Sequence, residues 1–480
     1  MDKTRQIRLT LCSILVLMAG NACDNTNAPK APSVKLSGAQ TVQVGDTITL
    51  QIISNGGSVY VRESSTDFKT VQMVGTNGVY GVGAGTGTVI ATLSDSHGAD
   101  LASDSVVVTV VPPPPSNRPA FIHIVTGSVS CGMSADGGVW CWGSGADLRS
   151  YAPRCEDYVE HVLERSCESV PTRVLGIPAL TGVNVGTYSV CGLVASGQTY
   201  CWGNSPGQPG APALTGGDIP FSSISVQRSI PLNNFNDSER ICGLTSAQQI
   251  YCWIRGGGAT SPALIQSPVL FNAVVVGGVR SGPAGNYTAC ALDADGNAYC
   301  WGFGALGDGN AARTVEQTTP VAVAGGLKFK EISIGDYHTC ALTLDGTAYC
   351  WQRNTSGETG TGPEAPLDSP LLVPTAVNTS LKFTRISAGT ARTCAVATDR
   401  GAYCWGYDHG FTPETPVPTQ VPGAYHFTSI STGFYVTCGL TVEGPEVCWG
   451  ANYLGFMGNG YLEGDRPTPT PIAGQRVFAN

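Results

Sequence analysis

Residues 290–302, Cys290-Ala-Leu-Asp-Ala-Asp-Gly-Asn-Ala-Tyr-Cys300-Trp301-Gly302, are the stretch that decides the fold. Two cysteines stand ten residues apart, and a tryptophan follows the second directly. The unit occurs seven times, as Cys131, Cys141 and Trp142; Cys191, Cys201 and Trp202; Cys242, Cys252 and Trp253; Cys290, Cys300 and Trp301; Cys340, Cys350 and Trp351; Cys394, Cys404 and Trp405; and Cys438, Cys448 and Trp449. Most of the chain is therefore one repeated motif.

The repeated unit predicts a β-hairpin, because apolar and aromatic residues flank a short Asp-Gly turn. If the two cysteines face each other, the loop is residues 294–296 and Gly296 is its third residue. That position favours a left-handed backbone and therefore glycine. Five of the seven copies have glycine there, and the exceptions are Gln248 and Arg400.

The same register predicts a disulfide in every hairpin. Hydrogen-bonded and open pairs alternate outward from the turn, which places the cysteines at an open pair with Cα atoms about 4.5 Å apart. A disulfide tolerates that separation. The alternatives are buried free thiols or a zinc site, but the residues between the cysteines supply no histidine to a metal.

Composition restricts the class of protein. The chain has 480 residues, more than one ordinary domain, and charged residues make up only 13% of it. Its net charge is −9 and it has no long basic run, which argues against nucleic acid or an anionic membrane surface as a partner.

The N-terminus predicts export. Lys3, Arg5 and Arg8 precede an apolar segment, residues 9–19, which is too short for a typical membrane span. We expect residues 1–22 to be a signal peptide that is removed. Export implies an oxidising compartment, in which paired cysteines form disulfides.

Cys23 has no expected disulfide partner, so it needs another explanation. Of 18 cysteines, fourteen lie in the hairpins, Cys155 and Cys167 form a further expected disulfide, and Cys12 lies in the signal. The segment Ala19-Gly-Asn-Ala-Cys23 resembles the lipobox of bacterial lipoproteins, although its glycine and asparagine depart from the pattern. The resemblance implies a lipid anchor at Cys23, with residues 23–32 as a disordered tether. The alternative is a secreted chain with an unpaired thiol.

Residues 33–111 predict a β-sandwich, since short alternating strands are separated by turn residues. Residues 42–46 and 78–92 resemble the bacterial immunoglobulin-like group 2 domain, which implies a spacer or adhesive module. Four prolines then begin a stiff linker, residues 112–118, that marks a domain boundary.

Residues 119–480 predict a seven-bladed β-propeller, so the whole chain is expected to be all-β. The repeats recur about every 50 residues, a period typical of propellers and solenoids. Besides the hairpin, each repeat has an entering strand that begins with phenylalanine, as at Phe329, and a closing strand that follows a proline, as at Pro320. Proline is tolerated at a sheet edge.

The repeats resemble those of the regulator of chromosome condensation family. The likeness is carried by residues 338–351, His-Thr-Cys-Ala-Leu-Thr-Leu-Asp-Gly-Thr-Ala-Tyr-Cys-Trp, and 301–309, Trp-Gly-Phe-Gly-Ala-Leu-Gly-Asp-Gly. It implies the propeller fold. The family includes a nuclear guanine-nucleotide exchange factor and a secreted bacterial β-lactamase-inhibitor protein, so the fold does not determine the function.

The two ends of the repeat region suggest how the ring closes. Residues 121–124 begin the first entering strand, and Val477-Phe478 resembles a fragment of the same strand. We expect the terminal strands to share one blade.

Candidate binding residues lie where the repeat is interrupted. The insertion between Cys155 and Cys167 is acidic, and we take it as a recognition loop, with a decorated surface loop as the alternative. Its candidate contact residues are Glu156, Asp157, Tyr158, Glu160, His161, Glu164 and Arg165. Other irregular candidates are residues 206–220, 228–240, 353–369 and 452–466.

These observations favour an exported, lipid-anchored, monomeric scaffold of the bacterial cell envelope that binds a protein or a glycan through its propeller loops. We expect no catalytic residues, cofactor, metal or nucleic-acid partner. The alternatives are an envelope hydrolase or lyase with a site on the propeller axis and, by family analogy alone, a guanine-nucleotide exchange factor. The exchange reaction is remote, because the family's exchange factor works in the nucleus.

Overall fold

The computed structural model divides the chain into two compact units, Met1–Pro114 and Pro115–Asn480. It describes residues 5–7, 33–38, 41–43, 47–55, 58–63, 71–74, 78–81, 85–94, 100–111, 120–127, 129–144, 167–186, 189–203, 212–227, 238–256, 260–278, 287–363, 370–407, 415–452, 455–460 and 465–473. Every regular element among these residues is a strand.

The first unit has two sheets. One has the order β1-β5-β8-β9-β3, and the other has the order β2-β4-β7-β6. The strands are β1 (Arg5–Ile7), β2 (Ser33–Gly38), β3 (Thr41–Gln43), β4 (Thr47–Asn55), β5 (Ser58–Glu63), β6 (Val71–Val74), β7 (Gly78–Gly81), β8 (Gly85–Ser94) and β9 (Asp100–Val111). β1 belongs to the expected signal peptide and lies at a sheet edge, so its removal would leave every internal strand paired.

The buried side chains of the first unit follow the alternation of its strands. Val34 and Leu36 are buried on β2, as are Val106 and Val108 on β9, while the residues between them point outward. The Leu36 amide donates a hydrogen bond of 2.7 Å to Asp104 Oδ2 on β9, which joins the two sheets.

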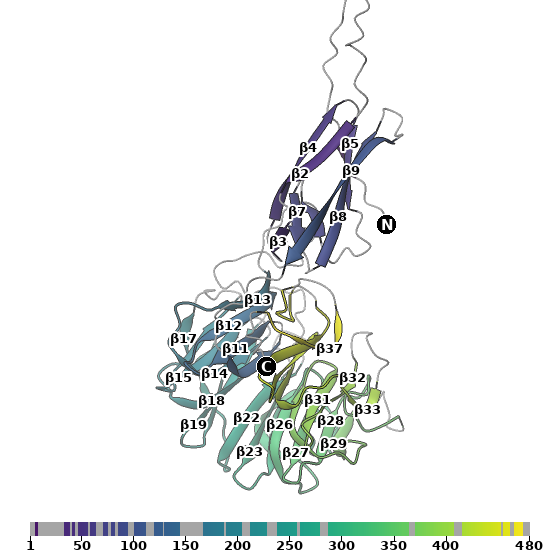
Figure 1. Cartoon of the computed structure of the whole chain (residues 1–480). Helices are drawn as coiled ribbons and strands as arrows, with labels where there is room; N and C mark the ends of the chain where they lie inside the picture. The colour runs from purple at the N-terminus through teal and green to yellow at the C-terminus, as the bar shows by residue number, and fades with distance from the viewer. Residues whose placement is uncertain are drawn as a thin grey trace, which may run out of the picture. The chain divides into compact units, whose positions relative to one another are not determined.

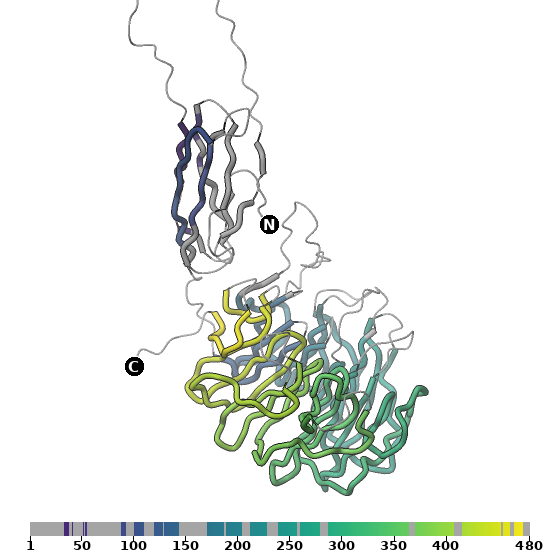
Figure 2. Tube along the Cα trace, turned by 90° about the vertical axis from the view of Figure 1, so that its right-hand side faces the viewer, coloured from purple at the N-terminus to yellow at the C-terminus, as the bar shows by residue number. Residues whose placement is uncertain are grey.

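The second unit contains seven sheets of four antiparallel strands, and each sheet is formed by four consecutive strands. These blades follow one another around a ring, as the colours of Figure 1 show, and Figure 2 shows them from the side. Blades 1 to 3 comprise β10 (Phe121–Thr126), β11 (Ser130–Ser134), β12 (Val139–Ser144), β13 (Cys167–Arg173); β14 (Leu180–Val185), β15 (Val190–Val194), β16 (Thr199–Trp202), β17 (Ala213–Thr215); β18 (Phe221–Val226), β19 (Ser238–Thr245), β20 (Ile250–Gly256), β21 (Ala263–Leu264).

Blades 4 and 5 comprise β22 (Phe271–Gly277), β23 (Thr288–Asp293), β24 (Ala298–Gly304), β25 (Arg313–Ala322); β26 (Phe329–Ile334), β27 (His338–Thr343), β28 (Ala348–Gln352), β29 (Leu371–Ala376). Blades 6 and 7 comprise β30 (Phe383–Ala388), β31 (Arg392–Ala397), β32 (Ala402–Gly406), β33 (Thr415–Gln420); β34 (Phe427–Thr432), β35 (Val436–Thr441), β36 (Glu446–Gly450), β37 (Arg466–Pro471). The seven-bladed propeller predicted from the repeats is therefore confirmed.

Each hairpin has the predicted register. Cys290 pairs directly with Cys300, and the Asp293 amide donates to the Asn297 carbonyl across the turn. The third loop residue has a positive φ in every copy, including the two without glycine, Gln248 at 61° and Arg400 at 68°.

All seven hairpin cysteine pairs form disulfides, with Cα atoms 4.1 Å apart in each. The bonded pairs are Cys131 with Cys141, Cys191 with Cys201, Cys242 with Cys252, Cys290 with Cys300, Cys340 with Cys350, Cys394 with Cys404, and Cys438 with Cys448. The separation is slightly shorter than the roughly 4.5 Å typical of an open antiparallel pair. Seven disulfides agree with an oxidising compartment.

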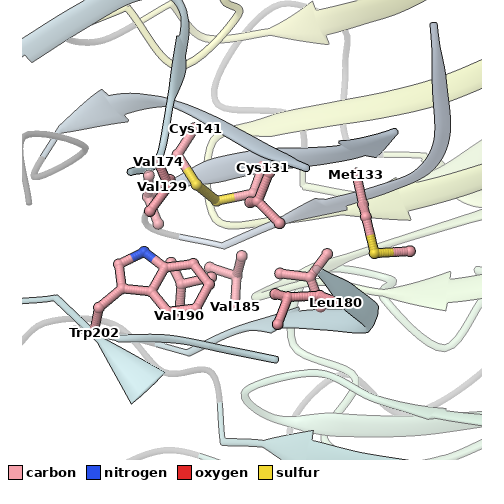
Figure 3. Packing of buried hydrophobic residues seen from close by; sticks show 11 residues of the cluster. Val129, Cys131, Met133, Cys141, Val174, Leu180, Val185, Val190 and Trp202 are labelled. Carbon is pink, nitrogen blue, oxygen red and sulfur yellow. A yellow bond between two sulfur atoms is a disulfide. The ribbon is translucent and has the colours of Figure 1, made fainter. Parts of the chain in front are cut away.

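The core between neighbouring blades pairs the disulfide of one blade with the tryptophan of the next. The Cys131–Cys141 disulfide of blade 1 packs with Trp202 of blade 2, together with valine and leucine side chains (Figure 3). The corresponding clusters recur at all seven interfaces, including the one at which the disulfide of blade 7 packs with Trp142 of blade 1. All seven tryptophans are at most 2% exposed. The tryptophan after each second cysteine is therefore a packing residue.

Backbone hydrogen bonds add a second repeated contact between blades. At six junctions the carbonyl of the third loop residue accepts a bond from the amide that begins the next blade, as from Phe329 to Gly296 at 2.7 Å. Because the left-handed residue turns its carbonyl toward the next blade, turn geometry and blade packing are coupled.

The seventh junction closes the ring differently. The Phe121 amide donates to Oε1 of Glu446 at 2.7 Å, so a side-chain carboxylate stands where the other junctions use a backbone carbonyl. Blades 1 and 7 each have four strands of their own, so the shared blade that we expected is not present among the described strands. Val477 and Phe478 lie outside the described residues.

Candidate functional site

The meander order of each blade places its connections at two opposite faces. The loops from the first to the second strand and from the third to the fourth share one face, which we call the loop face. The hairpin tips and the links between blades share the other, the hairpin face. Three of the irregular candidate segments, residues 228–240, 353–369 and 452–466, connect strands at the loop face. The candidate segment 206–220 includes β17.

The acidic insertion lies between β12 and β13 in the sequence. Its candidate contact residues, Glu156 to Arg165, and the cysteine Cys155 lie outside the described residues, as does Cys23. The disulfide expected between Cys155 and Cys167, the insertion as a binding loop and the lipidation site therefore stay predictions.

The loop face contains a pocket between blades 5, 6 and 7, with a volume of 230 Å³. Aromatic rings and two arginines dominate its lining, and none of its described lining residues is acidic. The lining residues are Tyr337, Arg353, Thr390, Ala391, Arg392, Tyr407, Thr432, Gly433, Phe434, Tyr435, Val436 and Thr437. The cavity is smaller than the roughly 300–1,000 Å³ of most ligand pockets, a size that suits a single side chain better than a larger ligand.

Arg353 follows β28 and is held by its neighbours. Its guanidinium carbon lies 4.1 Å from the centre of the Tyr337 ring, a cation–π contact. Its Nε donates to Thr355 Oγ1 at 2.6 Å and lies 3.9 Å from Oε1 of Glu358. The Glu358 side chain is fully buried, and that burial raises the pKa of its carboxyl group. Arg353 itself is 43% exposed, so its outer end faces the pocket and solvent.

A second arginine–tyrosine pair lies between blades 3 and 4. The guanidinium carbon of Arg240 is 3.8 Å from the centre of the Tyr287 ring. The Tyr287 hydroxyl donates to Oε1 of Glu316 at 2.7 Å, and Arg240 Nη2 lies 3.8 Å from the same oxygen. Burial raises the pKa of Tyr287, so its hydroxyl keeps the proton that it donates. Here an arginine, a tyrosine and a carboxylate form one group.

The propeller axis is narrow on the loop-face side. The cavity there measures 20 Å³, about the room that one water needs, and glycines from five blades line it. A side chain at Gly335 would lie 1.9 Å from the Gly389 carbonyl oxygen, so the blades approach too closely for larger residues. This axial cavity leaves no room for a substrate.

The described histidines and acidic residues do not form a metal site. No group of three or more histidine, cysteine, aspartate or glutamate side chains in the described part of the chain is placed to hold an ion. His338 is fully buried and its Nε2 lies 2.7 Å from Thr393 Oγ1, while burial lowers its pKa to about 3. It is a neutral core histidine. The described ranges also contain no helix long and apolar enough to span a membrane.

The candidate segments 228–240 and 353–369 contain Arg240 and Arg353, but sequence reasoning missed the tyrosines that pair with these arginines, although the repeat contains a signal for them. Tyrosine stands three residues before the first hairpin cysteine in four of the seven copies, at Tyr188, Tyr287, Tyr337 and Tyr435. Aligning the repeats at that position would have singled out these tyrosines. The arginines could not have been found in this way, because Arg240 and Arg353 occupy different positions in their repeats.

Comparisons with known proteins agree with this architecture. Residues 295–342 and 329–358 match the regulator of chromosome condensation (RCC1) repeat. Yeast RCC1 (Prp20), in a crystal structure bound to Kap60, is 18% identical with a TM-score of 0.55, over 77% of this chain and 91% of that one. Human WBSCR16 is 15% identical with a TM-score of 0.54, over 70% of this chain and 93% of that one. Prp20p of Saccharomyces cerevisiae, solved in a study of its binding to Gsp1p and histones, is 17% identical with a TM-score of 0.52, over 75% of this chain and 88% of that one. Identities this low show the fold alone, and the second unit is a seven-bladed propeller that contains RCC1 repeats.

Proposed function

We propose that the protein is an exported, lipid-anchored scaffold whose loop face binds a protein of the cell envelope. The observation that carries the proposal is the pocket of aromatic and arginine side chains on that face. Tyrosine, phenylalanine and arginine are enriched at the centres of protein interfaces, where a few such residues supply most of the binding energy. The irregular loops around them supply the variable contacts.

Several features support export and anchoring. Residues 1–22 have the charge and apolar pattern of a signal peptide, and the seven disulfides require oxidation. In this proposal Cys23 is the lipidated residue and residues 23–32 are the tether. Residues 33–111 are an immunoglobulin-like spacer, followed by the linker at 112–118. If Cys23 is not lipidated, the protein is secreted.

The binding role is preferred over the two alternatives on specific grounds. An enzyme with its site on the axis would need a substrate cavity, and the described axial cavity holds about one water. Guanine-nucleotide exchange rests on a likeness of fold alone.

The binding role is tested by a photo-crosslinker placed on either face of the full chain in intact cells. Tyr407, which is 37% exposed and lines the pocket, is replaced by p-benzoylphenylalanine; Leu344, which is 67% exposed at a hairpin tip, receives the same group as the matched control. We expect a discrete protein adduct from position 407 and none from 344. Equal adducts at both positions, or no adduct at 407, would contradict the proposal.

Anchoring is tested separately with Cys23→Ala. The wild-type chain should partition into the detergent phase of Triton X-114, and the variant should move to the aqueous phase. Aqueous partition of the wild type would show that the mature chain has no lipid.

A further inference from the structure

The two arginine–tyrosine pairs differ in one respect that points to a ligand. Tyr287 and Tyr337 occupy the same position of their repeats, three residues before the first hairpin cysteine. In each pair the guanidinium lies over the tyrosine ring, at 3.8 Å for Arg240 and 4.1 Å for Arg353. The pairs therefore present the same two donors, a guanidinium and a phenol.

The pair of blades 3 and 4 already holds a carboxylate. Glu316 lies on β25, an outer strand, and reaches both donors with one oxygen, at 2.7 Å from the Tyr287 hydroxyl and 3.8 Å from Arg240 Nη2. The chain thus contains its own example of a glutamate, presented by an extended segment, bound to an arginine stacked on a tyrosine.

The pair of blade 5 has the same donors, but the carboxylate beside it, Glu358, lies 3.9 Å from Nε of Arg353 and accepts no hydrogen bond from its terminal nitrogens or from the Tyr337 hydroxyl. Arg353 uses its Nε for Thr355 and its face for Tyr337, while its two terminal nitrogens have no hydrogen-bond partner among the described residues. The Tyr337 hydroxyl likewise has no partner in the described part of the chain. Both residues line the 230 Å³ pocket, whose described lining carries two arginines and no acidic residue.

We propose that this pocket binds a glutamate side chain presented by an extended segment of the partner protein. The terminal nitrogens of Arg353 form the fork that matches a carboxylate, and its contacts with Tyr337 and Thr355 fix that fork before binding. The aromatic walls of the pocket cover the apolar neighbours of the glutamate. The inference rests on the proposed binding role and names the chemistry of its ligand.

The probe is a fluorescein-labelled acetylated peptide, Thr-Val-Glu-Gln-Thr-Thr, which copies residues 314–319 around Glu316. Its binding to the full chain is measured by fluorescence polarisation at low salt, beside the same peptide with glutamine in place of glutamate. We expect the glutamine peptide to bind at least tenfold more weakly, because it lacks the charge that the arginine fork recognises. Arg353→Lys keeps the charge and loses the fork, so it should weaken binding of the glutamate peptide about tenfold, and Tyr337→Phe should weaken it severalfold.

Arg240→Lys is the matched control, because its carboxylate position is already occupied by Glu316, and it should leave peptide binding unchanged. Near-ultraviolet circular dichroism confirms that each variant is folded; should Arg353→Lys fail to fold, Tyr337→Phe carries the test. Equal binding of the two peptides, no measurable binding of either, or no effect of the two pocket substitutions would overturn the inference. Competition by digalacturonic acid together with failure of the peptide to bind would also overturn it and would assign the pocket to an acidic glycan. Equal binding of the two peptides together with a protein crosslink from position 407 would leave the scaffold role intact while refuting the glutamate site.

Discussion

Removal of the Glu446 carboxylate tests how the ring is closed. Glu446 is 3% exposed and accepts the Phe121 amide at 2.7 Å, and Phe121 is itself 6% exposed. In Glu446→Ala the Phe121 amide loses its carboxylate acceptor. The lost hydrogen bond to a charged group and the cost of burying the amide without that acceptor predict that the free energy of unfolding falls by about 3 kcal/mol. Glu446→Gln keeps an acceptor oxygen and loses only the charge, so we expect about 1 kcal/mol.

The assay is denaturant unfolding of the full chain followed by tryptophan fluorescence. All eight tryptophans lie between Trp140 and Trp449, so the signal reports the propeller alone. Glu443→Ala is the matched control: its carboxylate belongs to the same blade and pairs with His426 at 2.6 Å, but both side chains are exposed and the pair should contribute under about 0.5 kcal/mol. If Glu446→Ala and Glu443→Ala had equal effects, or if Glu446→Gln were as harmful as Glu446→Ala, the carboxylate would not be what closes the ring.

Three further predictions concern the repeated unit. Arg400 adopts a φ of 68°, so Arg400→Gly should raise the free energy of unfolding by about 1 kcal/mol. Gly296→Ala should lower it by about 2 kcal/mol, because a Cβ there would lie 2.7 Å from the Phe329 carbonyl oxygen. A destabilised Arg400→Gly in thermal melts would contradict this reasoning. His338 has a pKa of about 3 in the folded chain and about 6.5 in the unfolded chain. Above pH 6.5 its titration therefore does not change the free energy of unfolding. Between pH 6.5 and 3 only the unfolded chain takes up the proton, so the free energy of unfolding falls as the pH falls. Between pH 7 and 5 the wild type should therefore lose about 2 kcal/mol more than His338→Gln, and parallel pH profiles of the two would refute the assignment. Replacing Cys290 and Cys300 together by alanine should cost about 3 kcal/mol in denaturant unfolding, since their closure of a ten-residue separation restricts the unfolded chain, and a loss below about 1 kcal/mol would contradict this reasoning.

The sequence was sufficient for the architecture of the blades because local chemistry determines it. The positions of the two cysteines and of Gly296 set the hairpin register, and the register in turn allows the disulfide. The contact between blades 1 and 7 was not predicted, because it uses Glu446, a buried carboxylate that no pattern in the repeat distinguishes.

The candidate site was predicted from the sequence as a set of irregular segments, without a choice of face. One of these segments, residues 353–369, begins with Arg353 of the pocket, and the structure places that pocket on the loop face. Its key pair, Arg353 and Tyr337, comes from two different loops of blade 5 that only the folded strands bring together. Whether a carboxylate of the chain itself binds an arginine depends on a residue far away in the sequence, as Glu316 is from Arg240. A single sequence does not show which distant residues lie close together in the fold.

Each hairpin disulfide joins two strands of one blade, so among the described residues no covalent bond other than the chain itself links one blade to the next. The contact of a disulfide with the following tryptophan is the same at the closing junction as at the other six. The ring therefore has no obligatory first blade. Joining residue 473 to residue 120 by a flexible linker and opening the chain at another link on the hairpin face should give a circular permutant with the same seven-bladed fold.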